Sequence, residues 1–440
     1  MTNRRTAALI GALTLLAGAA ARAERPWAVP VEGAPFAGKL LGVDAAWRLT
    51  FGVGDQRRTI PAADLVKWGR CLEQGRGGLL VLIDGSLLVV DGVTADQQRV
   101  TAESDSLGAL ELPLEAIAGV VFHPPSDPQR RDAIVDRIVQ PTASRSLAGD
   151  SPVVSAAVTA DRVILFNGDE LAGLLTGIAD ESVRLKTDAG PVEIANERVL
   201  AIVFNPSLRR KLADGECPTK AWLGLCDGSR LLATRLIVDG DRTTFTAVGQ
   251  PLTASRGEVA FLQPLGGRVV YLSDTTPSEY RQTPLLELSW PCGNDRNVSG
   301  GLLRADGRLY LKGLGVHADA RLVYVLASGD AGRGMGDAGR SPIGRKAGEA
   351  PGARAVGMAA RRFESLVAID DSAAGGGSVR FHVLVDGREQ FVSPILRGGD
   401  RPAPVSVDLT GAKRLELIVD SADRGDVLDR ADWLDARICF

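Results

Sequence analysis

Residues 166–187 read FNGDELAGLLTGIADESVRLKT, and this stretch determines the fold class expected for the N-terminal part of the chain. Asn167 and Gly168 form a hairpin-turn signal, because both residue types tolerate a positive φ. Along residues 183–187 apolar and basic side chains alternate, which is the period of a half-buried strand. We therefore expect short strands that bury Val183 and Leu185 and are joined by tight turns.

The same pattern recurs along the chain. Residues 83–122 and 225–262 each begin with an Asp-Gly turn signal and end on an apolar strand, and residues 36–61 form a weaker copy. Each copy supplies about five short strands over roughly 40–45 residues, so the copies must pack on one another to bury a core. They resemble small five-stranded Sm-like or SH3-like barrels, which implies an array of small β-barrel repeats.

Short helices are expected after two of the copies. Asp127 precedes Pro128, which places a capping carboxylate and a first-turn proline at a helix start. Residues 205–212 follow the next copy with a similar pattern. His123 lies in the corner between the first of these barrels and its helix, where we expect a structural turn histidine.

Composition excludes one class of partner. The 440 residues include 51 Lys and Arg against 54 Asp and Glu, a net charge of −3. A nucleic-acid-binding surface needs an excess of basic residues, so the RNA binding of Sm-like proteins is not expected here. Aromatic residues make up only 5 % of the chain, which leaves few stacking platforms for a sugar ring.

The first 23 residues have the pattern of a secretory signal peptide. Arg4 and Arg5 precede an uncharged apolar run at residues 6–20, and Ala-Arg-Ala at 21–23 is a cleavage site before Glu24. We expect an exported protein (periplasmic, cell-surface or secreted) with no transmembrane segment after cleavage. An uncleaved N-terminal anchor is the alternative.

Five cysteines leave at least one unpaired. A loop disulfide between Cys217 and Cys226 and a pairing of Cys292 with Cys439 are open alternatives to five buried free thiols, Cys71 included. With three histidines and no Cys-x-x-Cys motif, a zinc site is not expected.

The C-terminal part carries a different series of motifs. In order, these are Tyr-Leu-Ser-Asp at 271–274, Tyr-Leu-Lys-Gly-Leu-Gly-Val-His-Ala at 310–318, a strand from Phe363 to Asp371, and Ala-Asp-Trp-Leu-Asp-Ala at 431–436. The series resembles the NPCBM domain, a carbohydrate-binding module with a galactose-binding-like jelly roll. The resemblance implies a β-sandwich over about residues 268–440. A Gly- and Ala-rich stretch at 328–360 departs from the family, and we expect it to be a disordered insert.

Candidate carbohydrate-binding residues lie within this region. Polar candidates are Asp295 and Arg296, for which a turn or ion-pair role is an equal alternative, and His317, for which a structural role is the alternative. Exposed aromatic rings suit the apolar face of a sugar, and the candidates are Tyr310 and Trp433, with Tyr280 and Trp290 as further platforms. A place in the core is the alternative for Trp433.

Asp370, Asp371 and Asp432 are candidate Ca²⁺ ligands, because carboxylate oxygens suit that ion. The resemblance supports this expectation, since galactose-binding-like jelly rolls often hold a structural calcium. Turn-capping hydrogen bonds are the main alternative for Asp370 and Asp371, and a sugar contact is the third.

The sequence therefore predicts an all-β, exported, non-catalytic protein whose partners are glycans. The chain contains no G-x-S-x-G or H-E-x-x-H motif. An envelope scaffold that binds proteins through the repeats and a cryptic glycoside hydrolase are the alternatives. The expected domains are the signal peptide (1–23), a degenerate repeat (24–75), two repeats with short helices (76–140 and 155–215), a further repeat (216–266) and the jelly roll (268–440).

Overall fold

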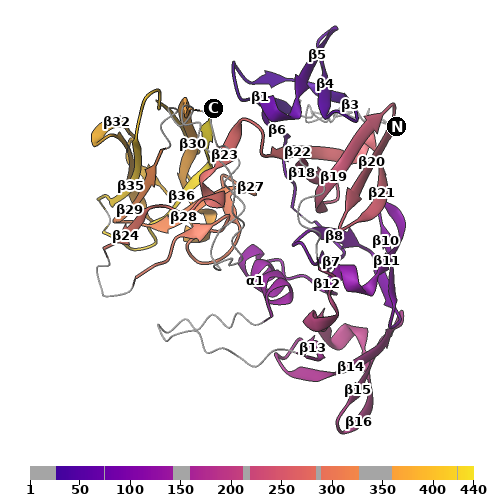
Figure 1. Cartoon of the computed structure of the whole chain (residues 1–440). Coiled ribbons are helices and arrows are strands. Elements are labelled where there is room, and N and C mark those ends of the chain that lie inside the picture. The colour runs from indigo at the N-terminus through magenta and orange to yellow at the C-terminus, as the bar shows by residue number, and fades with distance from the viewer. Residues whose placement is uncertain are drawn as a thin grey trace, which may run out of the picture.

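The computed structural model describes residues 26–73, 75–141, 159–211, 219–283, 289–326, 359–423 and 425–440 (Figure 1). Within these ranges the regular structure is β-strand, apart from 3-10 turns and one α-helix. The prediction of an all-β fold is therefore confirmed. The predicted signal peptide and nearly all of the predicted insert at 328–360 lie outside the described residues.

Four copies of one strand arrangement, units 1 to 4, make up the N-terminal array. Unit 1 holds β1 (Trp27–Pro30), β2 (Phe36–Ala37), β3 (Lys39–Val43), β4 (Arg48–Val53), β5 (Gln56–Pro61) and β6 (Leu65–Gly69). Unit 2 holds β7 (Gly78–Leu82), β8 (Leu87–Val90), β9 (Gly92–Ala95), β10 (Arg99–Ser104), β11 (Gly108–Pro113) and β12 (Ile117–Val121). Unit 3 holds β13 (Asp161–Leu165), β14 (Glu170–Ile178), β15 (Ser182–Thr187), β16 (Gly190–Ala195) and β17 (Val199–Val203). Unit 4 holds β18 (Lys220–Leu225), β19 (Arg230–Asp239), β20 (Arg242–Ala247), β21 (Gln250–Ser255) and β22 (Val259–Leu265).

Each unit places its last strand beside its first. The order is β17–β13–β14–β15–β16 in unit 3 and β22–β18–β19–β20–β21 in unit 4. Units 1 and 2 keep this order, but their second strand is split into β2 and β3 or into β8 and β9. A 3-10 turn precedes the last strand in every unit (Ala62–Asp64, Leu114–Ala116, Asn196–Arg198 and Arg256–Glu258).

The units are open sheets rather than the closed barrels that the sequence suggested. Among the described strands no pairing joins the fourth strand of a unit to its last strand. The last strand instead uses its second edge to pair with the last strand of another unit: β12 pairs with β17, and β22 pairs with β6. Because a strand has only two edges, this pairing prevents closure and merges the units into one 22-stranded sheet.

Glycines allow these inter-unit strands to approach closely. A Cβ atom at Gly119 of β12 would lie 2.1 Å from the carbonyl oxygen of Ile202 in β17. A Cβ atom at Gly69 of β6 would lie 2.0 Å from the carbonyl oxygen of Ala260 in β22. Glycine is therefore required at both inter-unit contacts.

Units 2 and 4 exchange matching hydrogen bonds from their hairpin turns. Oγ of Ser229 accepts a hydrogen bond from Val89 N at 2.9 Å, and Oγ of Ser86 accepts one from Leu232 N at 2.8 Å. Both serines are fully buried. Buried leucine, valine and phenylalanine side chains from all four units form one continuous core around this contact.

The helix α1 (Pro128–Val139) lies between the array and the C-terminal domain (Figure 1). The Asp127 side chain caps its N-terminus by accepting a hydrogen bond from Gln129 N at 3.0 Å, as predicted. The Arg209 guanidinium donates to the carbonyl groups of Ile138 and Val139 at its C-terminal end. The second predicted helix is only a 3-10 turn at Pro206–Leu208.

The C-terminal domain is a sandwich of two antiparallel sheets. The array-side sheet has the order β25–β28–β36–β30–β34 with β23 beside β36, and the outer sheet has the order β24–β29–β35–β31–β32 with β33 beside β31. The array-side strands are β23 (Val269–Tyr271), β25 (Gly293–Asn294), β28 (Gly313–His317), β30 (Arg362–Ile369), β34 (Ala403–Asp408) and β36 (Arg430–Cys439). The outer strands are β24 (Glu279–Gln282), β29 (Ala320–Val325), β31 (Ser378–Val385), β32 (Arg388–Val392), β33 (Leu396–Arg397) and β35 (Arg414–Ser421). A hairpin of β26 (Leu303–Ala305) and β27 (Arg308–Tyr310) completes the domain.

The structure does not contain the pairing of Cys292 with Cys439, which the sequence left open. Cys292 precedes the edge strand β25, whereas Cys439 ends β36 and packs on Val31 and Val66 of unit 1. Because β28 separates β25 from β36, the two thiols lie apart in the sheet, and both are free, as are Cys71 and Cys226. Cys217, which the sequence offered as the partner of Cys226, lies outside the described residues.

None of the helices in the described ranges is long and apolar enough to cross a membrane.

Candidate carbohydrate-binding site

Trp433 is not a sugar platform. It lies in β36 between β28 and β30, and none of its surface is exposed. Its ring packs against those of Phe381 and Phe363, with centroid distances of 5.1 and 6.1 Å. The core position, the alternative given for Trp433, therefore describes it, because this face of β36 packs against Phe381 of the outer sheet.

Tyr310 also lacks a free face. It is 7 % exposed at the end of β27, and the Lys67 ammonium of unit 1 lies 5.0 Å from its ring centroid. Burial raises the pKa of Tyr310 to about 12. The ring therefore lies in the contact between the sandwich and the array, where it is closed to a glycan.

Asp295 and Arg296 take the ion-pair role that was the alternative to sugar contact. The Lys312 ammonium donates a hydrogen bond to Asp295 Oδ2 at 2.8 Å, and Gly313 N donates to Oδ1 at 3.1 Å. The Arg296 guanidinium donates to Asp136 of α1 at 2.6 Å. Both side chains are occupied by partners within the protein, and Arg296 helps to attach the sandwich to the helix.

His317 is stacked on a second aromatic ring. At the end of β28 its imidazole lies parallel to the indole of Trp290, with a centroid distance of 5.3 Å and an interplanar angle of 9°. Gln282 Oε1 accepts a hydrogen bond from Trp290 N, and the Trp290 carbonyl accepts one from the Tyr280 hydroxyl. These bonds hold the part-exposed indole in place. Burial lowers the pKa of His317, so the imidazole is neutral at pH 7.

Carboxyl groups lie beside this stack. Asp319 follows β28, and the turn before β36 contributes Asp426 and Asp429. Asp429 is fully buried; its Oδ1 accepts a hydrogen bond from Ser378 N at 2.7 Å, and its Oδ2 has no partner. Burial, with the charges of Asp426 and Asp319, raises the pKa of Asp429 to about 6. This end of the sandwich, which we call the Trp290–His317 end, combines an aromatic pair with carboxyl groups.

Sequence reasoning found part of this end and missed the rest. The sequence could nominate Trp290 and His317, because the ability of a ring to stack on a sugar depends on the type of residue. Asp426 and Asp429 carry no local signal, because only the packing of the turn before β36 against β28 brings them to the stack.

The three predicted calcium ligands lie together, and two of them accept hydrogen bonds from the protein. Asp370 accepts hydrogen bonds from Asn297 Nδ2, Arg304 N and Ser372 N, all at 2.9 Å. Asp371 accepts hydrogen bonds from the backbone N–H groups of Asp306 and Gly307. Turn-capping bonds, the main alternative for these two residues, therefore describe them. Within the described ranges no group of three or more His, Cys, Asp or Glu side chains is arranged to hold a metal.

Asp432 is the unusual member of the group. It is fully buried, and neither carboxylate oxygen accepts a hydrogen bond from a protein N–H or hydroxyl group. Burial, followed by the neighbouring charges of Asp370 and Asp371, raises the pKa of Asp432 well above its usual range. A protonated Asp432 can donate a hydrogen bond to the neighbouring Asp370.

A family model matches the C-terminal region in which the motifs lie. Residues 268–341 and 347–439 match the family model of the NPCBM/NEW2 domain. The resemblance predicted from the sequence is thereby confirmed for the sandwich. The NPCBM region begins at β23 and ends in β36, the two neighbouring strands that join the sandwich to the array.

One curated relative matches part of the chain. It is a Renibacterium salmoninarum protein named "Putative endo-alpha-N-acetylgalactosaminidase", with 26 % identity over 147 residues. The match covers 33 % of this chain but only 8 % of that relative. The chain therefore corresponds to a small part of the relative's length.

Solved structures similar to the chain include carbohydrate-binding modules. One is a CBM51 from Clostridium perfringens GH95 in complex with methyl-galactose, with 22 % identity, a TM-score of 0.30, and coverage of 39 % of this chain and 99 % of that one. Another is CBM51-2 with INT domains of Clostridium perfringens ZmpB in complex with GlcNAc, at 22 % identity and a TM-score of 0.30, covering 46 % of this chain and 37 % of that one.

The NPCBM domain is attached to the array by buried ion pairs. The Arg304 guanidinium bonds Asp132 of α1 through two N–H groups, at 2.6 and 3.2 Å, and donates to Glu73 at 2.6 Å. Burial alone would raise the pKa of Asp132, but the hydrogen bonds and charge of Arg304 hold it below its usual value. Lys67 of unit 1 pairs with the buried Asp435 of β36. The sandwich is therefore fixed to the array by bonds that water cannot easily replace.

Proposed function

We propose that this protein is an exported, non-catalytic glycan-binding protein that acts through its NPCBM domain. The observation that carries the proposal is the match of residues 268–439 to a family of carbohydrate-binding modules. Trp290 and His317 supply an aromatic face, and Asp426 supplies a hydrogen-bond acceptor for sugar hydroxyls beside Asp319, whose Oδ1 accepts from Ser421. Neutral or amino sugars are the favoured ligands, since acidic sugars would meet these carboxylates.

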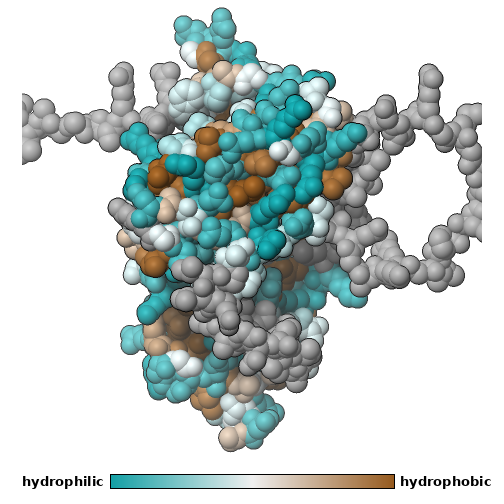
Figure 2. Space-filling model, turned by 90° about the vertical axis from the view of Figure 1, so that its left-hand side faces the viewer, coloured by the Kyte–Doolittle hydropathy of each residue, from teal (hydrophilic) through white to brown (hydrophobic). Residues whose placement is uncertain are grey.

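The surface of the sandwich supports a polar ligand. On the face of the molecule shown in Figure 2, hydrophobic residues are scattered among hydrophilic ones instead of forming one broad apolar patch. Val325 and Val392 are the large hydrophobic residues exposed on the outer sheet, at 74 % and 47 %. A mixed surface of this kind suits a hydroxyl-rich polymer better than an apolar protein partner.

A glycan array probed with the full chain tests the proposal. We expect binding to neutral or amino-sugar glycans and a loss of roughly tenfold or more in affinity for Trp290→Ala, because a central aromatic contact is removed. Phe166→Ala is the matched control: Phe166 is 54 % exposed and its ring centroid lies 5.4 Å from that of His123, but it lies in unit 3. Failure of the full chain to bind any glycan, or equal losses in both variants, contradicts the proposal.

Two alternatives are tested in parallel. Leu174 and Val192 favour a protein-binding scaffold, because they are 51 % and 37 % exposed on the hairpins of unit 3. A scaffold predicts that the chain captures envelope proteins and that Leu174→Ser abolishes this capture. A cryptic glycosidase predicts release of the chromophore from aryl glycosides of the sugar that the glycan array identifies. We expect no release.

Export predicts that the mature protein begins at Glu24 when the N-terminus of the full gene product is sequenced.

A further inference from the structure

An open pocket in the described part of the array shares no lining residue with the Trp290–His317 end. It is formed between units 1 and 4 and has a volume of about 760 Å³. Unit 1 contributes β3, the β4–β5 turn, β5 and β6, and unit 4 contributes the 3-10 turn Arg256–Glu258 and the start of β22. Small-ligand sites usually have volumes of about 300–1,000 Å³, so this pocket is large enough for one or two sugar rings.

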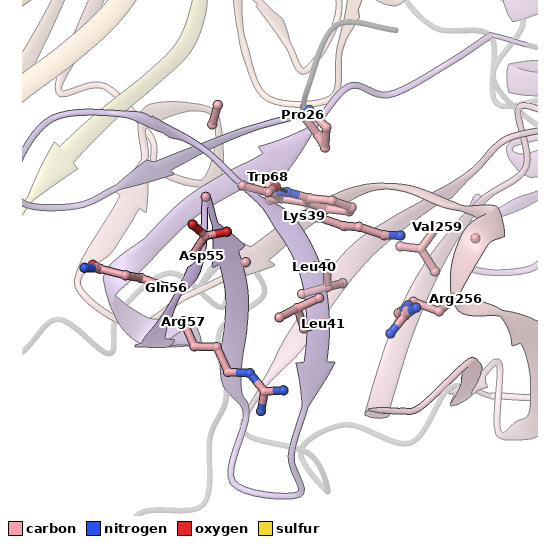
Figure 3. Close-up of a pocket in the computed structure, with 15 residues that line it drawn as sticks. Pro26, Lys39, Leu40, Leu41, Asp55, Gln56, Arg57, Trp68, Arg256 and Val259 are labelled. Carbon is pink, nitrogen blue, oxygen red and sulfur yellow. Dashed lines mark hydrogen bonds between the residues drawn. The ribbon is translucent and has the colours of Figure 1, made fainter.

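Three basic residues line this pocket. Lys39 comes from β3, Arg57 from β5 and Arg256 from unit 4, and Asp55 is the carboxylate in the pocket lining. Figure 3 shows Lys39 and Arg256 on one side of Leu40 and Leu41, with Asp55 and Arg57 on the other. The pocket is thus basic, whereas the chain as a whole has a net charge of −3.

These basic groups are not used to hold the fold. Among the described residues, the side chains of Lys39, Arg57 and Arg256 have no hydrogen-bond or ion-pair partner. The neighbouring Arg58, by contrast, lies 4.2 Å over the ring of Phe36. Like charges gathered around one cavity repel one another, and an anionic ligand relieves that repulsion.

The remaining walls suit a ring rather than a bare ion. Leu41 provides part-exposed apolar surface beside the buried Leu40 and Val259, and the buried Trp68 supports the wall with its Nε1 donating to Gly38 O at 2.7 Å. Pyranose rings have an apolar C–H face and a hydroxyl edge, so they can contact such walls while a carboxylate or sulfate group meets the basic side chains.

We propose that the pocket between units 1 and 4 is a second binding site, for a saccharide that carries carboxylate or sulfate groups. The site lies in the repeat array and does not depend on ligand binding by the NPCBM domain. Its charge is opposite to that of the Trp290–His317 end, so the two sites select different sugars. A protein with both sites can bind a neutral and an acidic glycan at the same time.

Affinity electrophoresis of the full chain tests this site. The probes are polygalacturonate for carboxylates, chondroitin sulfate for sulfates, dextran as a neutral glycan and poly-L-glutamate as an acidic peptide. The test variant is Lys39→Gln/Arg57→Gln/Arg256→Gln. The matched control is Lys186→Gln/Arg198→Gln/Arg242→Gln, which removes the same charge from exposed positions in units 3 and 4.

We expect retardation by one or both acidic glycans, weakening with added salt, and a loss of about 10- to 100-fold in affinity in the test variant alone. Equal losses in the two variants show charge attraction without a site and overturn the proposal, as does binding of poly-L-glutamate in preference to both glycans. Absence of acidic-glycan binding also overturns it. Trp290→Ala separates the sites: it affects binding of neutral glycans only, so failure of one proposal is distinguishable from failure of the other.

Discussion

The two carboxyl groups of Asp370 and Asp432 are the least ordinary residues of the sandwich. Asp370 accepts three N–H hydrogen bonds and is 1 % exposed, whereas Asp432 has no donor among the protein groups around it. One proton held between the carboxyl groups explains both environments. A bound Ca²⁺, the hypothesis drawn from the sequence, is the alternative and stays a prediction.

Asp432→Asn distinguishes the two explanations. An amide can donate to Asp370 without taking up a proton, so we expect the variant to be more stable than the parent at pH 7.5. Because the pKa of Asp432 is raised in the folded state, the parent must take up a proton when it folds. The difference in unfolding free energy between the variant and the parent should therefore grow by up to about 1.4 kcal/mol per pH unit between the unfolded and folded pKa values of Asp432. Urea unfolding at pH 4 and 7.5 measures it. If Ca²⁺ bridges the carboxylates, added Ca²⁺ instead raises the melting temperature of the parent, and the variant is less stable.

The raised pKa of Asp429 predicts that folding stability changes over a defined range of pH. Its folded pKa of about 6 is above the unfolded value, so its contribution to stability is present at low pH and is lost as pH rises from about 4 to 6. We expect Asp429→Asn to gain about 2–3 kcal/mol relative to the parent between pH 4 and 7. Thermal unfolding across this range checks the gain, with the exposed Asp188→Asn as control. Parallel curves for parent and Asp429→Asn count against the assignment.

At the scale of elements, the inter-unit strand pairs depend on glycine. Gly119→Ala places a Cβ atom against the Ile202 carbonyl and the Ile138 side chain, so β12 and β17 must separate or shift. We expect a loss of about 1–3 kcal/mol in unfolding free energy. Gly92→Ala is the control, because Gly92 lies in β9 of the same unit with open space around it. Equal unfolding midpoints for the two variants contradict this description of the contact.

Strand pattern was readable from the sequence, but strand pairing was not. The alternation at residues 183–187 correctly placed Val183 and Leu185 in the core, where each is 1 % exposed or less. Closed barrels were expected because the repeats resemble small five-stranded Sm-like or SH3-like barrels. The sequence has no local signal that the last strand of one unit pairs with the last strand of another, since that pairing joins residues about 80 and 190 positions apart.

At the scale of the whole molecule, the buried ion pair between Arg304 and Asp132 joins the NPCBM domain to the array. Their side chains are 9 % and 4 % exposed. Arg304→Met leaves Asp132 buried without its cation, and we expect a loss of about 3–5 kcal/mol and a separate, earlier calorimetric transition for one domain. Arg130→Met, on the exposed face of the same helix, should change stability by about 0.5 kcal/mol or less. A single unshifted transition for Arg304→Met would falsify the coupling.

The sequence by itself determined the β class, the internal repeat, the helix start at Asp127 and the likeness of the C-terminal region to the NPCBM domain. These features depend on local periodicity, turn residues and motif order, which adjacent residues encode. The tertiary structure alone showed that the units stay open and that Trp433 and Tyr310 are buried. It also showed that Lys39, Arg57 and Arg256 line one pocket. The burial of a side chain and the clustering of charges depend on which distant strands pack together. The sequence could not predict them, because the length and composition of a strand do not specify its neighbours.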